Sequence, residues 1–444
     1  MIELSPEIIA IIMLGGVLVG VLTGYPLAIV VGALGLIVGY TIFGDTIGKL
    51  IYSRMYSLML SYVILATPLF IFMGSMLERS GIAEKLYDSL YLWLGGIRGG
   101  LAISTVLIGT VLAACVGIIG ASVTMLAIVA LPAMMKRGYS KSIASGSVCA
   151  GGTLGILIPP SIMLIFYGPM AEISVGKLFF GAFIPGFLLS SLYCIYIALR
   201  SLLQPEVAPA VPVNERKVPF TKKTAMLVTS LFPPALLILA VLGTIFFGVA
   251  PPTEAASIGA LCSILLTIAY GKFNWQGLRE TSLLTLKMCS FIILIATMAF
   301  AFVGVFVGAG CGEVVKNLII AAPGGRWGSF AAIMFICFIL GMFIDWIGIV
   351  FIMVPIITPV GPALGFDPIW FAIMICVNLQ MSFLTPPFAP ALFFVRGAAD
   401  PELKVTMVDI IRGVIPFVIL IMIGIGLCAA FPQLILWLPG LMID

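Results

Sequence analysis

Apolar segments of about 20 residues recur from one end of the chain to the other, and a helix of that length crosses the hydrocarbon core of a bilayer. The pattern predicts an all-α integral membrane protein. The predicted membrane segments lie near residues 8–22, 27–43, 56–76, 101–116, 121–135, 145–166, 179–199, 226–248, 254–270, 288–308, 329–344, 347–360, 369–394 and 413–437. Several are too short to span alone, and 102–115 with 121–135, and 329–344 with 347–360, form two pairs of half-helices.

Two proline pairs interrupt apolar segments. Pro159-Pro160 lies in GGTLGILIPPSIMLIFYG, and Pro386-Pro387 lies in NLQMSFLTPPFAPALFFVRG. Proline removes a backbone donor and disfavours helix at the preceding residue. Because freed backbone groups cannot face lipid, a broken helix persists where protein buries it or where it lines a wet cavity. Matching breaks in two halves of a chain predict a transport site between repeats.

The two halves resemble each other in order and spacing. Leu131-Pro132 matches Val354-Pro355, the two proline pairs match each other, and Ile184-Pro185 matches Ile415-Pro416. The longest polar stretch, residues 204–223, carries four prolines and separates the halves. We therefore expect a first membrane repeat over residues 1–203, a cytoplasmic linker over 204–223 and a second membrane repeat over 224–444.

Basic residues indicate that the second repeat is inverted. The loop at 133–141 holds three Lys or Arg residues, and its counterpart at 356–367 holds none. The next loop reverses this, with one basic residue in 167–177 and three in 395–412. Since basic loops stay cytoplasmic, equivalent loops are expected on opposite sides of the membrane. Inverted repeats with interrupted helices are typical of secondary transporters.

Composition narrows the function further. The chain has 444 residues, of which 62% are hydrophobic and 9% charged, and its net charge of +4 gives no reason to expect nucleic acid. It has no histidine, and its nine cysteines are scattered singly, so a zinc or haem site and a disulfide framework are not expected. We find no nucleophile–base pair and no phosphate-binding loop, which argues against an enzyme. The N-terminus reads as a first membrane helix because it lacks the basic region of a signal peptide.

Polar residues at the interruptions are the candidate site. Backbone amides and carbonyls at a helix break can bind an anion or a cation. Asp345 lies far from other charges along the sequence and at membrane depth, where a carboxylate is costly and therefore points to function; the simpler interpretation is a helix N-cap. Ser122 aligns with Asp345, and both are possible sodium ligands. The full candidate set for substrate or ion binding is Gly117, Gly120, Ser122, Thr124, Thr153, Gly341, Asp345 and Thr385.

Several motifs together resemble the large membrane subunit (DctM-like) of a tripartite ATP-independent periplasmic (TRAP) transporter. They are GTLGILIPPSIML, the TEAA segment at 253–256, the FID segment at 343–345 and VNLQ with LTPPFAPALFF. LPAMMKRGY with SGSVCAGGTLGILIPPS resembles the branch for mannitol, chloroaromatic compounds, 2-oxoacids or lactate. The resemblance implies an elevator-type symporter of the bacterial inner membrane that uses sodium as coupling ion and no cofactor. It also implies re-entrant hairpins near 55–95 and 287–322.

The same resemblance implies two partners, a small four-helix membrane subunit and a soluble periplasmic substrate-binding protein. The expected function is sodium-coupled uptake of a small organic carboxylate, such as a 2-oxoacid or hydroxy acid. A single-component dicarboxylate–sodium carrier would share the inverted repeats, and only dependence on partners separates the two. A proton-translocating subunit of an electron-transfer complex is a third alternative, but it would need several intramembrane Lys, Glu or His residues, and this chain offers chiefly Asp345.

Overall fold

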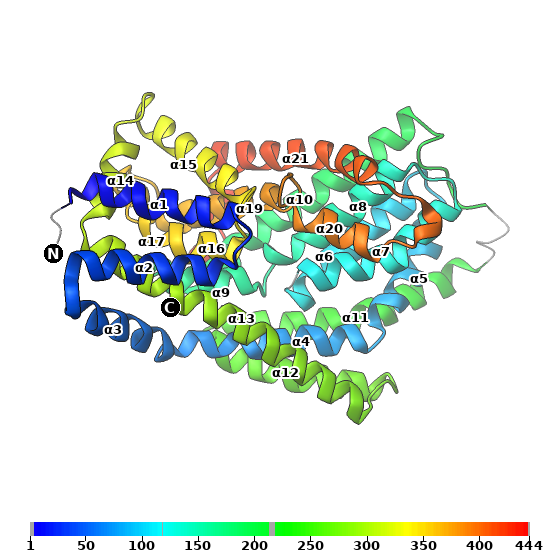
Figure 1. The fold of residues 1–444 in the computed structure, drawn as a ribbon. Helices are drawn as coiled ribbons and strands as arrows, with labels where there is room; N and C mark the ends of the chain where they lie inside the picture. Colours follow the sequence, from blue (N-terminus) through cyan, green and yellow to red (C-terminus); the bar gives the residue numbers. More distant parts are fainter. Residues whose placement is uncertain (1–3, 118, 213–217, 443–444) are drawn as a thin grey trace.

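The computed structural model describes residues 4–117, 119–212 and 218–442, and within these ranges every regular element is a helix. Nine helical stretches of the described chain are long and apolar enough to cross a membrane. The helices run roughly parallel to one long direction of the molecule, horizontal in Figure 1, with loops gathered at its two ends. The predicted all-α membrane fold is therefore confirmed.

The first half of the chain contains ten α-helices. They are α1 (Pro6–Leu22), α2 (Leu27–Phe43), α3 (Ile47–Met59), α4 (Ala66–Arg79), α5 (Ile82–Leu94), α6 (Gly100–Val116), α7 (Ile119–Lys136), α8 (Lys141–Thr153), α9 (Ile162–Ala171) and α10 (Val175–Leu203). A short 3-10 turn, η3 (Leu154–Ile156), and the first proline pair separate α8 from α9. The predicted break at Pro159-Pro160 thus lies between two half-helices.

The second half follows the same order. Its elements are α11 (Phe220–Phe246), α12 (Pro252–Ala269), α13 (Trp275–Gly308), α14 (Cys311–Ile320), α15 (Gly325–Gly341), α16 (Trp346–Gly348), the π-helical η5 (Ile349–Met353), α17 (Val354–Ile357), α18 (Val360–Ala363), α19 (Pro368–Ser382), α20 (Pro390–Ala398), α21 (Met407–Ala430) and α22 (Gln433–Leu436). The second proline pair separates α19 from α20. Within each proline pair, the peptide bond between the two prolines is cis.

The helices α6 and α7 form a re-entrant hairpin that opens toward the linker. The backbone N–H of Gly99, just before α6, donates to Ala208 O, and that of Ser140, just after α7, donates to Val207 O, both at 2.9 Å. The two ends of the hairpin are therefore held by one short piece of linker. The tip lies at Gly117, whose φ of 62° suits a glycine in a tight reversal. We call this end of the molecule, at the right of Figure 1, the linker end.

The second hairpin, α15 to α18, opens at the opposite end. An aromatic cluster joins the start of α15 to the residues before and in α19: ring centroids of Trp327 and Phe366 lie 5.4 Å apart, and those of Phe330 and Trp370 lie 5.2 Å apart. Figure 1 shows the two hairpins pointing toward each other from the two ends of the molecule. This is the inverted arrangement that the basic residues predicted.

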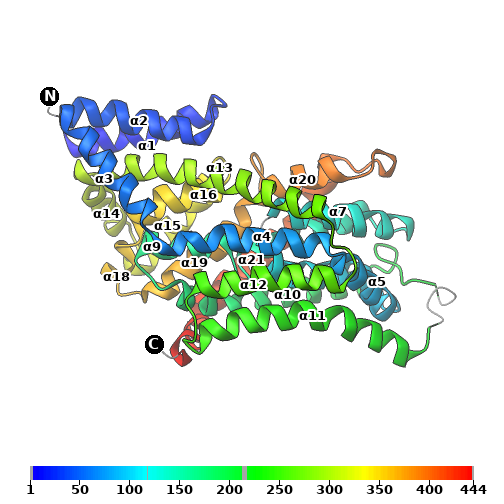
Figure 2. The same cartoon turned by 90° about the horizontal axis from the view of Figure 1, so that it is seen from below.

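The hairpin positions expected from the family resemblance are wrong. Residues 55–95 form the end of α3 with α4 and α5, and residues 287–322 belong to the long helix α13 and to α14. Figure 2 shows α13 crossing much of the length of the molecule as one helix. The true hairpins occupy residues 100–136 and 325–363, where glycines at 99, 117, 324 and 325 have positive φ and allow the chain to reverse.

Small residues let the inner helices approach closely. A Cβ added to Gly109 of α6 would lie 2.5 Å from Gly151 O of α8, and one on Gly146 of α8 would collide with Gly413 O of α21. In a membrane the hydrophobic effect does not drive helices together, so van der Waals contact between such small residues is a main cause of helix association. Through these close contacts, α8 and the break that follows it lie at the centre of the bundle, between the first hairpin and α21.

Candidate transport site

The tips of the two hairpins meet at one cavity of about 530 Å³. The first tip contributes Gly117, Ile119 and Gly120, and the second contributes residues 345–347. Helices α4 and α13 form the facing wall, and Phe388 and Phe394, before and within α20, contribute aromatic side chains. We call this space the hairpin cavity. Four of the predicted residues line it together: Gly117, Gly120, Thr124 and Asp345.

The first tip lies against both proline breaks. A Cβ placed on Gly117 would be 3.4 Å from Pro160 O, so the tip touches the carbonyl that the first break exposes. A Cβ on Gly120 would be 3.1 Å from Cζ of Phe394, which lies on α20 beyond the second break. Glycine at these two positions therefore brings backbone of one repeat against the interrupted helix of each repeat.

Asp345 begins the return arm of the second hairpin. Its Oδ1 accepts a hydrogen bond from its neighbour Trp346 N–H at 2.9 Å, so it is the N-cap of α16. The described residues offer Asp345 no other side-chain hydrogen bond and no ion pair. The Phe388 N–H, just after the second proline pair, donates to Met342 O at 2.9 Å and fixes this tip to the second break. The carboxylate is thus held in place with one oxygen free to bind a cation.

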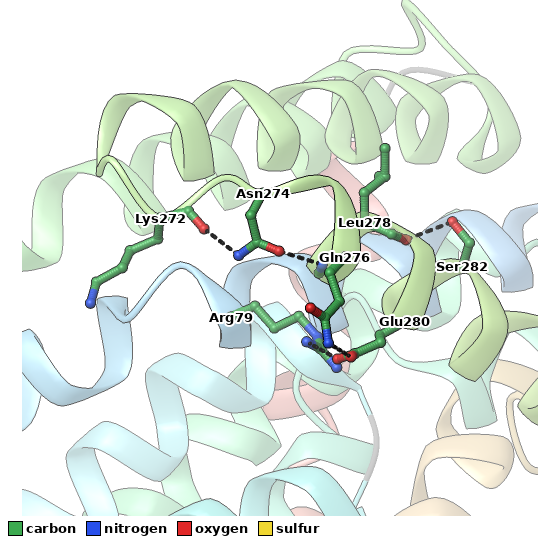
Figure 3. Close-up of polar contacts among 8 residues, drawn as sticks. Arg79, Lys272, Asn274, Gln276, Leu278, Glu280 and Ser282 are labelled. Carbon is green, nitrogen blue, oxygen red and sulfur yellow. Dashed lines mark hydrogen bonds and ion pairs between the residues drawn. The ribbon is translucent and has the colours of Figure 1, made fainter.

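Two residues of α4 that the sequence analysis did not select also line the cavity, Ser75 and Glu78. Glu78 is partly buried and has no ion-pair partner among the described residues. The neighbouring residue Arg79 instead donates to Glu280 of α13 at 2.7 Å, and Gln276 donates to the same carboxylate at 2.9 Å (Figure 3). This contact joins the end of α4 to the start of α13 beside the cavity. In the sequence, Glu78 could have been selected as the carboxylate that follows a long run of residues without charge.

The other four predicted residues lie outside the cavity lining. Thr153 Oγ1 donates to Ala150 O at 3.1 Å, and Thr385 Oγ1 donates to Met381 O at 2.7 Å, so each hydroxyl bonds a backbone carbonyl shortly before it in the chain. Gly341 packs against the Ser382 side chain. Ser122 is buried, and its Oγ lies 3.8 Å from the place that a Cβ would take on Gly155. Ser122 therefore faces the first break and not the open space.

Two buried hydroxyls occupy related places and lack hydrogen bonds. Ser122, on the first hairpin, faces Gly155 of η3; Ser382, at the end of α19, faces Gly341 of the second hairpin. Neither oxygen has a partner among the described residues. Since Ser382 is the repeat counterpart of Gly155, each hairpin meets its broken helix through one serine and one glycine. A buried hydroxyl without a partner is costly and suggests an oxygen ligand for a missing group.

The hairpin cavity has a mostly apolar lining whose charged residues are acidic. Among the described residues that line it, Glu78 and Asp345 are charged, and none is Lys or Arg. The described chain has no cluster of three or more His, Cys, Asp or Glu residues that could hold a transition metal. Carboxylate, hydroxyl and carbonyl oxygens are the ligands of hard cations, so the chemistry fits an alkali cation better than a catalytic centre.

The sequence is similar to a known family of membrane proteins. The sequence matches the family described as "Tripartite ATP-independent periplasmic transporter, DctM component" over residues 14–434. It is 30% identical over 382 residues to the C4-dicarboxylate TRAP transporter large permease protein DctM of Pseudomonas aeruginosa, which covers 85% of this chain and 86% of that protein. It is 26% identical over 423 residues to the ectoine TRAP transporter large permease protein TeaC of Halomonas elongata, covering 95% and 96% of the two chains.

The fold also resembles a solved structure. The crystal structure of the Alcanivorax borkumensis YdaH transporter superposes with a TM-score of 0.61 at 14% identity, covering 97% of this chain and 100% of that one. That likeness supports the fold alone. The family match spans nearly the whole chain, both hairpins and both proline breaks. This protein therefore belongs to the DctM family of TRAP transporter large permeases, and it is a multi-pass protein of the bacterial inner membrane and not an enzyme.

Proposed function

We propose that this permease takes up a small organic carboxylate, such as a 2-oxoacid or hydroxy acid, and couples the uptake to sodium entry. The observation that carries the proposal is the meeting of two hairpin tips and two broken helices at one cavity that contains Asp345. Helix breaks of this kind bind ions and substrate in secondary transporters. Relatives named for C4-dicarboxylates and for ectoine both support a small polar substrate that carries a carboxylate.

Sodium fits the oxygen ligands found at the hairpins and beside the broken helices. Asp345 supplies a carboxylate, and Ser122 and Ser382 supply buried hydroxyls without partners. Carbonyls beside the breaks complete such a site without further side chains. One cation crossing the membrane contributes about 2.3 kcal/mol per 100 mV, which is enough to drive accumulation of a substrate. The sequence contains no GxxxxGK[ST] motif, so an ion gradient is the better energy source.

We further propose that transport needs the small membrane subunit and a substrate-loaded periplasmic protein, as the family description implies. The test is reconstitution in liposomes. We expect little uptake by this chain alone, and uptake on adding both partners that requires an inward sodium gradient. Robust uptake by the isolated chain would instead support a single-component carrier. Uptake that follows ATP after the sodium gradient has been collapsed would contradict the ion-coupled mechanism.

A further inference from the structure

A second cavity, of about 600 Å³, lies between α13 and the loops at the end opposite the linker. Its walls include Arg54 of α3, Glu172 after α9 and the proline-rich return arm of the second hairpin. We propose that this second cavity is an outward-side subsite for a monocarboxylate, with Arg54 as the residue that binds the carboxylate. The proposal rests on the proposed function, because it assumes that the substrate is a carboxylate.

The repeat relation ties this second cavity to the hairpin cavity. Ile71, Ser75 and Glu78 of α4 line the hairpin cavity, and the residues 229 positions later, Phe300, Gly304 and Val307 of α13, line the second cavity. The α4 wall of the hairpin cavity and the α13 wall of the second cavity are therefore counterparts in the two repeats. The helix α13 lines both, and its lining residues Met288 and Gly304 are about 24 Å apart at a rise of 1.5 Å per residue.

The charges of the two cavities differ. Arg54 and Glu172 are the charged residues among those described around the second cavity, whereas the hairpin cavity has Glu78 and Asp345. A carboxylate thus meets a cationic side chain at the outward subsite and two acidic side chains at the other cavity. This difference favours binding of a carboxylate at the outer end and its release from the hairpin cavity, the direction required for uptake.

Arg54 is placed for anion binding. Its side chain crosses α13 at Gly304, where an added Cβ would lie 3.0 Å from Arg54 Cγ and 3.4 Å from Nε. The guanidinium is exposed and has no ion pair or hydrogen bond with any described residue. Arginine presents a planar fork of donors that binds a carboxylate through two parallel hydrogen bonds. Glycine at position 304 is what lets the arginine lie flat against the wall of the cavity.

Glu172 restricts the ligand to one carboxylate. It adopts a left-handed conformation with φ of 57°, which costs energy for a residue with a Cβ, and it ends α9, where a negative charge is disfavoured. It has no ion-pair partner among the described residues. Two local costs at one exposed residue suggest a functional reason for the carboxylate. With one arginine and one glutamate around the space, a second carboxylate on the ligand meets repulsion instead of a partner.

The test measures binding without transport. We would purify the chain with its small subunit and follow its melting temperature at fixed sodium and ionic strength, with lactate and 2-oxobutyrate as monocarboxylate probes and succinate as the dicarboxylate. We expect the monocarboxylates to stabilise the native complex and succinate to do so at least tenfold more weakly. Arg54→Gln should weaken monocarboxylate binding at least tenfold, and Arg54→Lys should retain part of it.

The matched control is Arg326→Gln, which removes an arginine that stacks on Trp327 and Phe366 and does not line the second cavity. Glu172→Gln should improve succinate binding relative to lactate. Equal binding by native protein and Arg54→Gln, or succinate binding as tight as lactate in the native complex, would overturn the proposal. If binding does not depend on Arg54 but sodium-driven uptake is still observed, the second-cavity proposal is wrong and the proposed function stands. If binding depends on Arg54 but no uptake is observed, the proposed function is wrong and the second-cavity proposal stands.

Discussion

Asp345 shows what single residues contribute and how far the sequence reveals them. Its isolation in an apolar region predicted that it belongs to the site, and it lines the hairpin cavity with Gly117, Gly120 and Thr124. The simpler N-cap interpretation is confirmed, because Oδ1 accepts the Trp346 N–H, and a role in binding stays a prediction. Glu78 and Ser382 were missed because their roles depend on which helix lies opposite, and a repeat alignment in one dimension does not contain that information.

The first prediction concerns the Asp345 carboxylate. Asp345→Asn keeps the size of the side chain and an acceptor for the Trp346 N–H but removes the charge that attracts a cation. We expect sodium-driven uptake by the reconstituted transporter to fall at least tenfold, in line with typical coupling free energies of about 1–3 kcal/mol. The matched control is Asp45→Asn, at an exposed residue remote from the cavity lining. Normal sodium dependence in Asp345→Asn would leave the residue as a helix cap only.

Among the helices, the two breaks were predicted correctly from the proline pairs, but the positions of the hairpins were not predicted correctly. The breaks were predicted because proline acts on its own backbone, and both occur where expected. The predicted half-helix pairs correspond to α6 with α7 and to α15 with the α16–α18 arm, yet the hairpins were expected elsewhere. Whether two apolar segments continue in line or fold back depends on the angle at a glycine such as Gly117, and apolar periodicity does not record that angle.

The second prediction concerns the contact between the second hairpin and α19. A Cβ on Gly341 would collide with both Oγ and Cβ of Ser382. Gly341→Ala should destabilise this contact by about 1–3 kcal/mol, as overpacking of a tight core does, and reduce uptake. Gly15→Ala is the control, since a Cβ there meets nothing within 4 Å in the same kind of helix.

A compensating variant separates packing from other effects of Gly341→Ala. Adding Ser382→Gly should restore the melting temperature, because the smaller residue makes room for the new methyl group. It should not restore uptake if the Ser382 hydroxyl is a sodium ligand. A Gly341→Ala protein that melts and transports like the native protein would show that the hairpin is looser than the structure indicates.

For the whole molecule, the inverted arrangement was predicted from basic residues and is present in the two hairpins that open at opposite ends. Which end faces the cytoplasm remains a prediction, as does the division of the chain at residues 204–223.

The third prediction concerns which end of the molecule faces the cytoplasm. A cysteine introduced at Lys141 or Gln204 should be protected from an impermeant thiol reagent added outside, and one at Pro362 should react. The measurement is labelling of intact cells.

The buried native cysteines reduce the background in this experiment, since several are fully enclosed in the bundle. Labelling before and after permeabilising the membrane provides the control, because Lys141 and Gln204 should react only afterwards. If cysteines at Lys141 and Pro362 react from the same side, the inverted topology is wrong.

The central claim is that the meeting point of the two hairpins holds a coupling sodium ion, and sodium binding by the purified protein tests it most directly. The melting temperature should rise with NaCl and not with KCl at equal ionic strength, since a ligand at 100 times its Kd stabilises the folded state by about 2.7 kcal/mol. Asp345→Asn should lose this sodium-specific rise, and Asp45→Asn should keep it. Equal effects of sodium and potassium on the native protein would contradict the claim.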